Sequence, residues 1–538
     1  TIMKTLSALT TLCFFFTFLH AQKVTFSEPE KTPYTATGNF IIGKIKNNIL
    51  VCKYITPSKK FEILVYDYNM KLKARIPFNT FANGDLYKLD FISHDNYFDA
   101  VAQYYSKKIF YCKAARFNEE AILMQQPVTL DSVRVTADGN NEVYSLVQSE
   151  NKKEICLLQA LQGVKKDCLQ LNYFMLDNNL AATGRKKICI PFNPSFTSIG
   201  SINMDNEGSL VFAEYIHKGF IGSSNTLGIF KIEKNSELLL NTQHEMGENE
   251  ITDISINIDN NHARYFISGI FEGITNEDNN SASTGIFTSV LNTNLSEKAA
   301  DSFYYMHKLP GLETAGSDGS ESFALSNVNA MNDSGYTMLY SVDRAPRIDE
   351  SYSAPVPRSI LNTDQNPFYK PINNSFNQVP VSSLGVPASP VYYNTQNNAY
   401  TSTDSYGTYL PPYNKPSIKA QAGNRKLFLM HVNNSNQIEW SLNLNSNLEQ
   451  DVISFVNLYQ CINTGNELHF LFPQMIDEKS GRMGAITVDA RGAVNTVPVI
   501  SNDFNYHFQT AMGVQIDPHS LVFPCEAHGK LAFARIEF

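Results

Sequence analysis

The sequence is poor in tryptophan and in charge, and it has no surplus of basic residues. It contains one tryptophan, Trp440, beside 35 phenylalanines and 27 tyrosines. Its formal net charge is −9, whereas nucleic acid and anionic membranes are bound by strongly basic surfaces. Charged residues make up 18% of the 538 residues and apolar residues 43%, which is enough for a large core. We therefore expect a folded protein with no nucleic-acid partner.

Motifs that mark catalytic and metal sites are also absent. The chain has no G-x-S-x-G, H-E-x-x-H or phosphate-loop sequence. Its closest approach to a metal motif, Cys525-Glu-Ala-His528, offers two ligands, which do not make a zinc site. We assign no catalytic residue, no metal and no cofactor. Enzymatic activity stays undecided but disfavoured, since two carboxylates can act together from distant parts of a chain.

The cysteines allow two interpretations. Eight are present and none forms a C-x-x-C pair; Cys13 lies in the apolar N-terminal segment, which leaves seven for the rest of the chain. Cys156 and Cys168 are the best candidates for a disulfide, because residues 161–165 between them are typical of a turn. The alternative is that all seven are small apolar residues buried in strands.

The N-terminus has the pattern of a secretory signal peptide. Lys4 provides a positive charge, residues 6–19 form an apolar stretch, and His20-Ala21-Gln22 fits cleavage after Ala21. The apolar stretch is shorter than the about 20 residues that a membrane-spanning helix needs. We expect residues 1–21 to be removed and the protein to be exported to the periplasm or the cell surface. No transmembrane anchor is expected to remain after cleavage.

A short phrase recurs along the chain, and helical periodicity is nearly absent. Each copy is an apolar strand followed by an Asn- or Asp-containing turn and a second strand. The eight copies are residues 63–69, 109–112, 173–178, 228–233, 285–290, 427–432, 485–489 and 531–536. Successive copies lie 46 to 64 residues apart, except for one interval of about 140. A unit of about 45–60 residues with four short strands is typical of a β-propeller blade.

The sequence therefore predicts an all-β fold, a single β-propeller of seven or eight four-stranded blades. The number of phrases favours eight, and additional strand-like material at residues 143–192 keeps seven open. The fifth blade is the clearest, with strands at 254–258, 264–270, 285–290 and 301–305. The last phrase ends the chain without a fourth strand. We expect Lys23-Val-Thr-Phe26 to supply that strand and so remove an open edge.

Residues 266–273, Phe-Ile-Ser-Gly-Ile-Phe-Glu-Gly, followed by Gly285-Ile-Phe, resemble the repeat of secreted bacterial β-propellers. The Phe-rich N-terminal segment and the Asn-, Lys- and Tyr-rich body are similar in style to exported proteins of Bacteroidota. The resemblance implies a fold and leaves the function open, because such propellers share no single activity.

One interval holds a proline- and tyrosine-rich insertion, residues 344–422, between the second and third strands of the sixth blade. It contains 11 of the 23 prolines and eight tyrosines, and proline at this density disfavours both helix and central strand. We expect it to be disordered or extended. The chain then divides into a signal peptide (1–21), a first part of the propeller (22–343), the insertion (344–422) and the last part (423–538). The candidate partner-binding residues are Tyr392, Tyr393, Tyr400, Tyr406, Tyr409 and Tyr413.

Three functions remain open at this point. The first is a non-catalytic binding or scaffold propeller that engages another envelope protein or a glycan. The second is a carbohydrate-active propeller enzyme with carboxylates near the central channel. The single tryptophan makes this second function less attractive, because sugar rings commonly stack on tryptophan. The third is a structural subunit of a cell-envelope secretion, adhesion or motility assembly.

Overall fold

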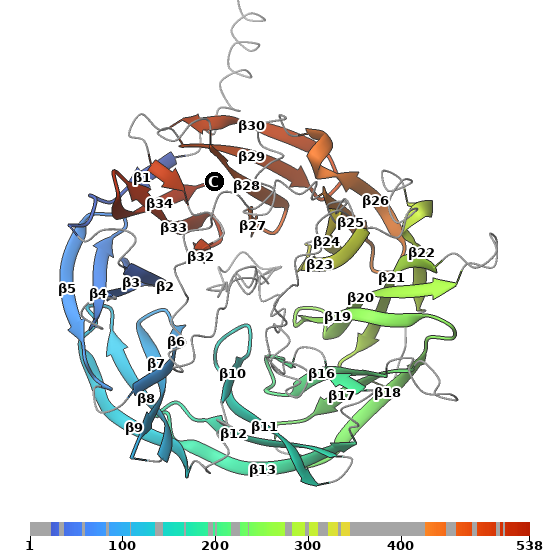
Figure 1. Ribbon diagram of the computed structural model, residues 1–538, viewed down its shortest axis with the longest axis horizontal. Coiled ribbons are helices and arrows are strands. Elements are labelled where there is room, and N and C mark those ends of the chain that lie inside the picture. Colours follow the sequence, from blue (N-terminus) through green and yellow to red (C-terminus); the bar gives the residue numbers. More distant parts are fainter. Residues whose placement is uncertain are drawn as a thin grey trace, which may run out of the picture.

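Eight antiparallel sheets stand in a ring in the computed structural model, each with its first strand nearest the axis of the ring and its fourth strand at the rim (Figure 1). The structure describes residues 23–31, 37–55, 60–81, 85–107, 109–134, 144–165, 168–191, 197–199, 202–216, 226–234, 236–274, 282–295, 301–309, 321–331, 335–344, 426–447, 459–475, 481–501, 506–508 and 512–538. The predicted signal peptide and nearly all of the predicted insertion lie outside these ranges.

The first four blades follow one another along the chain, each with four strands in radial order. Blade 1 comprises β2 (Thr37–Ile45), β3 (Asn48–Ile55), β4 (Lys60–Asp67) and β5 (Leu72–Phe78). Blade 2 comprises β6 (Asp85–Ser93), β7 (Tyr97–Ser106), β8 (Ile109–Asn118) and β9 (Leu123–Arg134). Blade 3 comprises β10 (Ser145–Gln148), β11 (Ile155–Lys165), β12 (Cys168–Leu176) and β13 (Ala182–Pro191). Blade 4 comprises a divided first strand, β14 (Thr197–Ile199) and β15 (Asn203–Met204), then β16 (Leu210–Ile216), β17 (Thr226–Ile232) and β18 (Leu239–Glu245).

The last four blades repeat this order, and the eighth combines both ends of the described chain. Blade 5 comprises β19 (Glu250–Asp259), β20 (Arg264–Ile274), β21 (Ala282–Asn292) and β22 (Ser302–Tyr305). Blade 6 comprises β23 (Glu321–Ala330), β24 (Tyr336–Arg344), β25 (Lys426–Val432) and β26 (Ile438–Asn443). Blade 7 comprises β27 (Gln460–Asn463), β28 (Glu467–Met475), β29 (Gly481–Asp489) and β30 (Val494–Ser501). Blade 8 comprises β31 (Tyr506–Phe508) and β32 (Val514–Asp517) as a divided first strand, then β33 (Ser520–Ala527), β34 (Lys530–Glu537) and β1 (Lys23–Phe26).

This arrangement confirms the all-β propeller and the count of eight blades. Residues 145–191 form one blade, so the additional strand-like material around them does not reduce the count. Each of the eight recurring phrases falls in the third strand of its blade, and the four strands predicted for the fifth blade correspond to β19 to β22. The insertion is flanked by β24 and β25, the second and third strands of blade 6, as the sequence predicts.

The Asn or Asp of the recurring phrase has a structural reason. Between the third and fourth strands of blade 3, one carboxylate oxygen of Asp177 accepts the N–H groups of Asn179 and Ala181, both at 2.8 Å. The same pair of contacts, to residues two and four positions ahead, is made by Asp67, Asn118, Asn433 and Asp489. The residue three positions ahead takes a left-handed backbone, as at Leu180 with φ 60°. The side chain of Leu180 is fully buried, so the turn also adds to the core.

The core lies between the blades. Buried apolar side chains form eight clusters in the described part of the chain, one at each seam between neighbouring blades. At the seam of blades 5 and 6, for example, the rings of Phe266 and Tyr336 stack with centroids 4.1 Å apart. Each blade therefore depends on both neighbours, and an open seam would expose two apolar faces to water.

The ring is closed by the N-terminal strand, as the sequence predicts. β1 pairs antiparallel with β34, with Val24 opposite Ile536 and Phe26 opposite Ala534 (Figure 1). The Phe26 ring stacks on Tyr506, with centroids 4.3 Å apart. Strands from the two ends of the chain thus share one sheet, which leaves no gap between blade 8 and blade 1.

None of the helices in the described part of the chain is long and apolar enough to cross a membrane.

Replacing Phe26 by alanine tests the closing strand. We expect Phe26→Ala to lower the free energy of unfolding by about 1–3 kcal/mol, because the half-buried ring leaves a gap beside Tyr506. Lys23→Ala, on the same strand but exposed, is the control and leaves stability unchanged within about 0.5 kcal/mol. Urea unfolding of both variants measures the effect, and equal stability would mean that β1 adds little to closure.

Candidate functional site

The predicted partner-binding tyrosines belong to a segment whose two ends are fixed at one point of blade 6. Tyr392, Tyr393, Tyr400, Tyr406, Tyr409 and Tyr413 lie outside the described residues. The strands on either side are described, and Val342 of β24 stands opposite Lys426 of β25 in the antiparallel ladder. Directly opposed residues of such a pair have Cα atoms about 5 Å apart. The chain therefore leaves blade 6 and returns to it at neighbouring positions of the same sheet.

The predicted disulfide between Cys156 and Cys168 is wrong. Cys168 is bonded to Cys189, and Cys156 is free and buried. Residues 161–165, which we expected to form a turn, belong to β11, so Cys156 stands opposite Met175. That position is seven residues from Cys168, or roughly 23 Å along a strand. Cys189 lies on the neighbouring strand opposite Gln170, with its Cα 5.7 Å from that of Cys168.

Three neighbouring turns near the axis are joined by hydrogen bonds between asparagines. These turns connect the first and second strands of blades 3, 4 and 5. The backbone N–H of Asn151 donates to Oδ1 of Asn206 at 3.0 Å, and the N–H of Asn206 donates to Oδ1 of Asn260 at 2.8 Å. Nδ2 of Asn260 then donates to Oε2 of Glu150 at 2.6 Å. We call Glu150, Asn151, Asn206 and Asn260 the turn cluster.

Glu150 is the ionisable member of the turn cluster. Burial raises its pKa to about 7, against the opposing effect of the hydrogen bond from Asn260, and the nearby Asp259 carboxylate adds to the rise. Its charge therefore changes near neutral pH. Groups with such pKa values are common at functional sites, and they also arise where a polar side chain holds a fold together.

Lys152 lies in the same turn as Glu150 and points toward blade 2. Its side chain is 6% exposed and its Nζ donates to Oγ of Ser93 at 3.0 Å. Burial lowers the pKa of Lys152 to about 7, against the opposing charge of Asp95. The turn of blade 3 is thus attached to blade 2 through Lys152 and to blade 5 through Glu150, so the two side chains diverge.

Two aspartates of these turns, Asp205 and Asp259, are occupied by structural contacts. Asp205 accepts two N–H groups of its own turn and the hydroxyl of Tyr265 from blade 5, at 2.9 Å. Asp259 accepts the hydroxyl of Tyr336 from blade 6 at 3.0 Å. A glycosidase needs two carboxylates that face one sugar. Asp205 and Asp259 each bind the tyrosine of the following blade, whereas Glu150 accepts the side-chain amide of Asn260.

The turn cluster was not predicted, although the sequence contains a sign of it. The phrase Ser-Ile-Asn-x-Asp-Asn occurs at residues 201–206 and again at 255–260, and its final residue in each copy is Asn206 or Asn260. The repeat marks the turns, but the contact of Asn260 with Glu150, 110 residues away, depends on how the blades are stacked.

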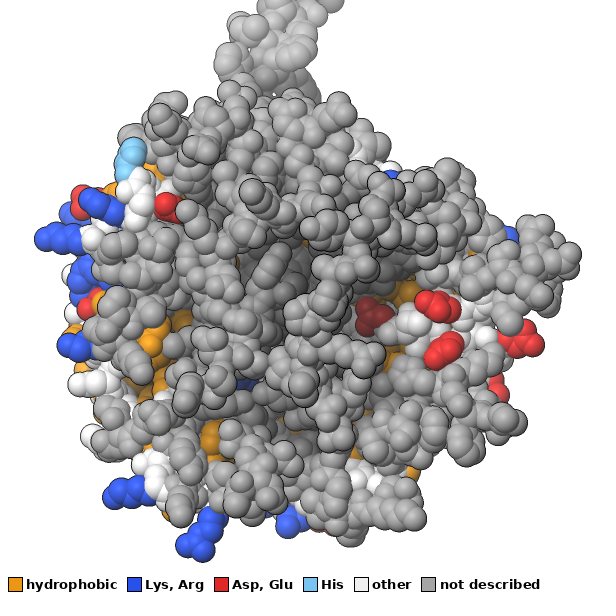
Figure 2. All heavy atoms as spheres, in the orientation of Figure 1, with side chains coloured by type: hydrophobic (Ala, Val, Ile, Leu, Met, Phe, Trp, Pro, Cys, Tyr) orange, Lys and Arg blue, Asp and Glu red, His pale blue; other side chains and the backbone are white. Residues whose placement is uncertain are grey.

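Charge is unevenly distributed around the ring. On the face shown in Figure 2, acidic side chains gather on the side that carries β19 and β20, and lysine and arginine side chains lie mostly on the other side. Glu250 and Glu272 stand directly opposite each other on β19 and β20. Like charges in that position are unfavourable by roughly 0.2–1 kcal/mol. The described side chains of blade 5 on this face are therefore mainly acidic.

The weak metal motif of the sequence is not assembled into a site. Cys525 is fully buried on β33, and His528 occupies the tight turn that follows, with φ 51°. Among the described residues, no group of three or more His, Cys, Asp or Glu side chains is placed to hold a metal ion.

Comparisons with known proteins leave the function open. No protein-family profile matches the chain, and neither does any curated protein. Solved structures similar to it include prolyl endopeptidases (7% identity, TM-score 0.39, covering 92% of this chain and 55% of that one). Another is a polysaccharide lyase, with 9% identity and a TM-score of 0.40, in a match that covers 85% of this chain and 90% of that one. A third is an endo-arabinase from Bacteroides thetaiotaomicron, with 10% identity and a TM-score of 0.24, in a match that covers 49% of this chain and 96% of that one. The chain spans about half the length of the prolyl endopeptidase it matches. Likenesses this distant carry no argument about function.

Removing the disulfide tests its position. We expect a peptide map under non-reducing conditions to yield Cys168 linked to Cys189, with Cys156 modified by a thiol reagent only after unfolding. Replacing both Cys168 and Cys189 by serine should lower the free energy of unfolding by about 3 kcal/mol, because the bond closes a loop over a sequence separation of 21. A linked peptide that contains Cys156 would contradict the assignment.

The raised pKa of Glu150 predicts a dependence of stability on pH. Between pH 4.5 and pH 7 the folded protein keeps the proton of Glu150 and the unfolded chain has lost it, so stability falls as pH rises through this window. We expect Glu150→Gln to remove up to about 3 kcal/mol of this fall. The control is the same charge change at exposed Glu120, which leaves the pH profile unaltered. Unfolding curves at several pH values decide between the two outcomes, and parallel profiles for wild type and Glu150→Gln would contradict the burial of this carboxyl.

Proposed function

We propose that the protein is an exported, non-catalytic β-propeller that binds an envelope protein or a glycan through the segment carried by blade 6. The observation that carries this proposal is the pairing of Val342 with Lys426. Because β24 and β25 pair directly, residues 345–425 are not needed to connect the two strands. A segment of that length, attached at one point of a closed ring, is suited to reaching a partner.

The composition of the segment supports binding by extended chain. Tyr392, Tyr393, Tyr400, Tyr406, Tyr409 and Tyr413 are interspersed with prolines. Proline restricts the unbound chain, and tyrosine offers a large apolar surface with a polar end, so aromatic rings can be presented at a low cost in entropy. The proposed location, periplasm or cell surface, rests on residues 1–21 and is tested by cell fractionation.

The carbohydrate-active alternative has less support. In the described turns near the axis, Asp205 and Asp259 are bound to tyrosines of the following blades, and Lys152 and Glu150 point to different blades. A structural role in a larger envelope assembly uses the same surface as partner binding, and the stoichiometry of the complex distinguishes the two.

Excising the segment tests the proposal. We expect a variant with residues 345–425 replaced by a short Gly/Ser bridge to fold with nearly unchanged stability, because loop-closure entropy changes by only about 0.6 kcal/mol per twofold change in length. The same variant should lose its partner. Crosslinking in the native envelope and binding to a glycan array measure the loss for wild type and variant side by side.

Tyrosine substitutions locate the binding residues. Serine at all six candidate tyrosines should remove binding in the full-length chain, whereas serine at Tyr352 and Tyr369, in the same segment, is the control and should preserve it. If the excised protein folds and retains every partner, the segment is a spacer and the proposal fails.

A further inference from the structure

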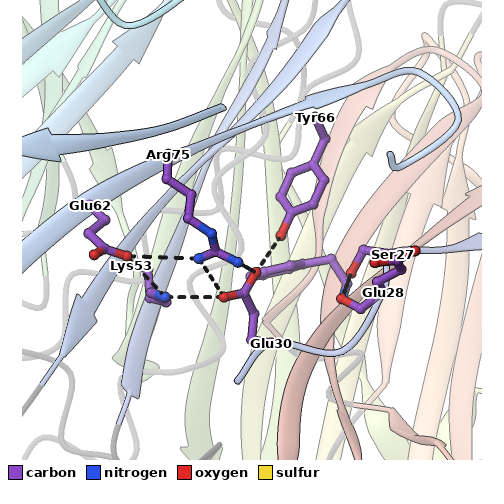
Figure 3. Close-up of polar contacts among 8 residues, drawn as sticks. Ser27, Glu28, Glu30, Lys53, Glu62, Tyr66 and Arg75 are labelled. Carbon is purple, nitrogen blue, oxygen red and sulfur yellow. Dashed lines mark hydrogen bonds and ion pairs between the residues drawn. The ribbon is translucent and has the colours of Figure 1, made fainter. Parts of the chain in front are cut away.

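The N-terminal segment lies along β34 of blade 8, and its end reaches blade 1, where Figure 3 shows Glu30 beside Lys53, Arg75 and Tyr66. Beyond the four residues of β1, the N–H of Ser27 donates to the carbonyl of Phe533 at 2.8 Å, and Oγ of Ser27 accepts the N–H of Phe533 at 3.0 Å. The N–H of Glu30 donates to the carbonyl of Leu531 at 2.6 Å. Backbone contacts thus continue along β34 for the whole length of residues 23–30.

Two apolar side chains anchor the segment on blade 8. Val24 and Phe26 alternate with exposed Lys23 and half-buried Thr25, and both pack on the cluster between blades 7 and 8. Phe26 lies between the rings of Tyr506 and Phe508, with centroids 4.3 and 6.2 Å away. The edge of blade 8 therefore selects an apolar residue at two alternate positions of an extended chain.

A buried carboxylate anchors the segment on blade 1. Glu30 is 3% exposed, and Arg75 donates to both of its oxygens, at 2.6 and 2.7 Å. Lys53, which is 1% exposed, lies 3.2 Å from Oε2, and the hydroxyl of Tyr66 points to Oε1 at 3.5 Å (Figure 3). Burial alone would raise the pKa of Glu30, but the bond from Arg75 and the charge of Lys53 outweigh it and hold that pKa below its usual value.

The two positive charges belong to blade 1, and the negative charge of Glu30 belongs to the N-terminal segment. Lys53 is on β3 and Arg75 on β5, so both stay behind when residues 23–30 are removed. Glu62, which is 3.1 Å from Lys53, is 30% exposed and gives only a partial substitute. An ammonium group in low-dielectric surroundings is unfavourable without a counter-charge. A strand that returns to this edge buries Lys53 again, and its ammonium group then needs a counter-charge, so the site favours an incoming carboxylate four residues beyond an apolar strand.

We propose that the outer edge of blade 8, along β34, together with Lys53 and Arg75 of blade 1, is a strand-acceptor site, and that the N-terminal segment of a second copy of this chain can replace the resident one. The site recognises an extended segment with apolar residues at its second and fourth strand positions, a serine next, and a carboxylate three residues later. Residues 23–30 carry this pattern in every copy of the chain. Backbone pairing supplies affinity, and Glu30 supplies specificity. The proposal does not depend on the segment carried by blade 6.

The experiment uses the folded full-length chain. A protease site is inserted between Lys31 and Thr37, the protein is cut after folding, and a fluorescent peptide of residues 22–31 is added as the segment of a second copy. We expect the peptide to enter the cut protein with saturable binding. The Glu30→Gln peptide should bind about 30-fold more weakly or worse, since the partner charges stay buried and unpaired. The Lys23→Ala peptide is the control and should bind within about twofold of wild type, because Lys23 is exposed.

Two results would overturn the proposal. One is that the wild-type peptide does not enter over several days at about 1 mM, which would make the segment a fixed part of the fold. The other is equal binding of the wild-type and Glu30→Gln peptides, which would remove the recognition by Lys53 and Arg75. If cutting unfolds the protein, the uncut Phe26→Ala variant, whose own strand is weakened, receives the same peptides and is judged by the same two results.

Discussion

Closure of the ring between blade 8 and blade 1 is the constraint on which the other contacts depend. The buried apolar clusters lie at the seams, so each blade is stable only with a neighbour on both sides. The cluster between blades 8 and 1 joins Tyr66 and Met70 of the first blade to Phe533 of the last. These residues are separated by almost the whole sequence, so this cluster joins the first blade of the ring to the last. Next to this cluster, β1 completes the sheet of blade 8, and Glu30 at the end of the same segment binds Arg75 of blade 1.

Burying the carboxylate of Glu30 is an energetically unfavourable way to join the N-terminal segment to blade 1. Burying Glu30 and Lys53 removes two charges from water, and replacing such a pair by apolar residues is often neutral for stability or better. What the charged pair adds is discrimination between the observed register of β1 on β34 and other registers. Val24 and Phe26 could bind β34 two residues out of register and still present apolar side chains to the same face. Only the observed register places Glu30 beside Arg75, which suits a strand that must find one position among many exposed sheet edges.

Features that depend on contacts between residues close in the sequence could be predicted, and features that depend on contacts between distant residues mostly could not. The turn at Asp177 is decided within five residues, and the recurring phrase therefore located the third strand of every blade. The closing strand was predictable because the last blade lacked a fourth strand. The predicted disulfide was wrong because the end of β11 has no clear strand breaker in the sequence, and a turn placed a few residues too early put Cys156 opposite the wrong residue of β12. The turn cluster could not be predicted, since it depends on contacts across three blades.

The asparagines near the axis explain why binding is assigned to the appended segment. The first strand of each blade has an unpaired edge, and such edges need hydrogen-bond partners. Nδ2 of Asn203 donates to the carbonyl of Ile256 in the next blade at 2.9 Å, and Nδ2 of Asn463 donates to that of Ala330 at 3.1 Å. These two amide side chains are thus engaged in joining one blade to another, and they are not available to a ligand in this arrangement. The proposal above accordingly assigns partner binding to the segment carried by blade 6.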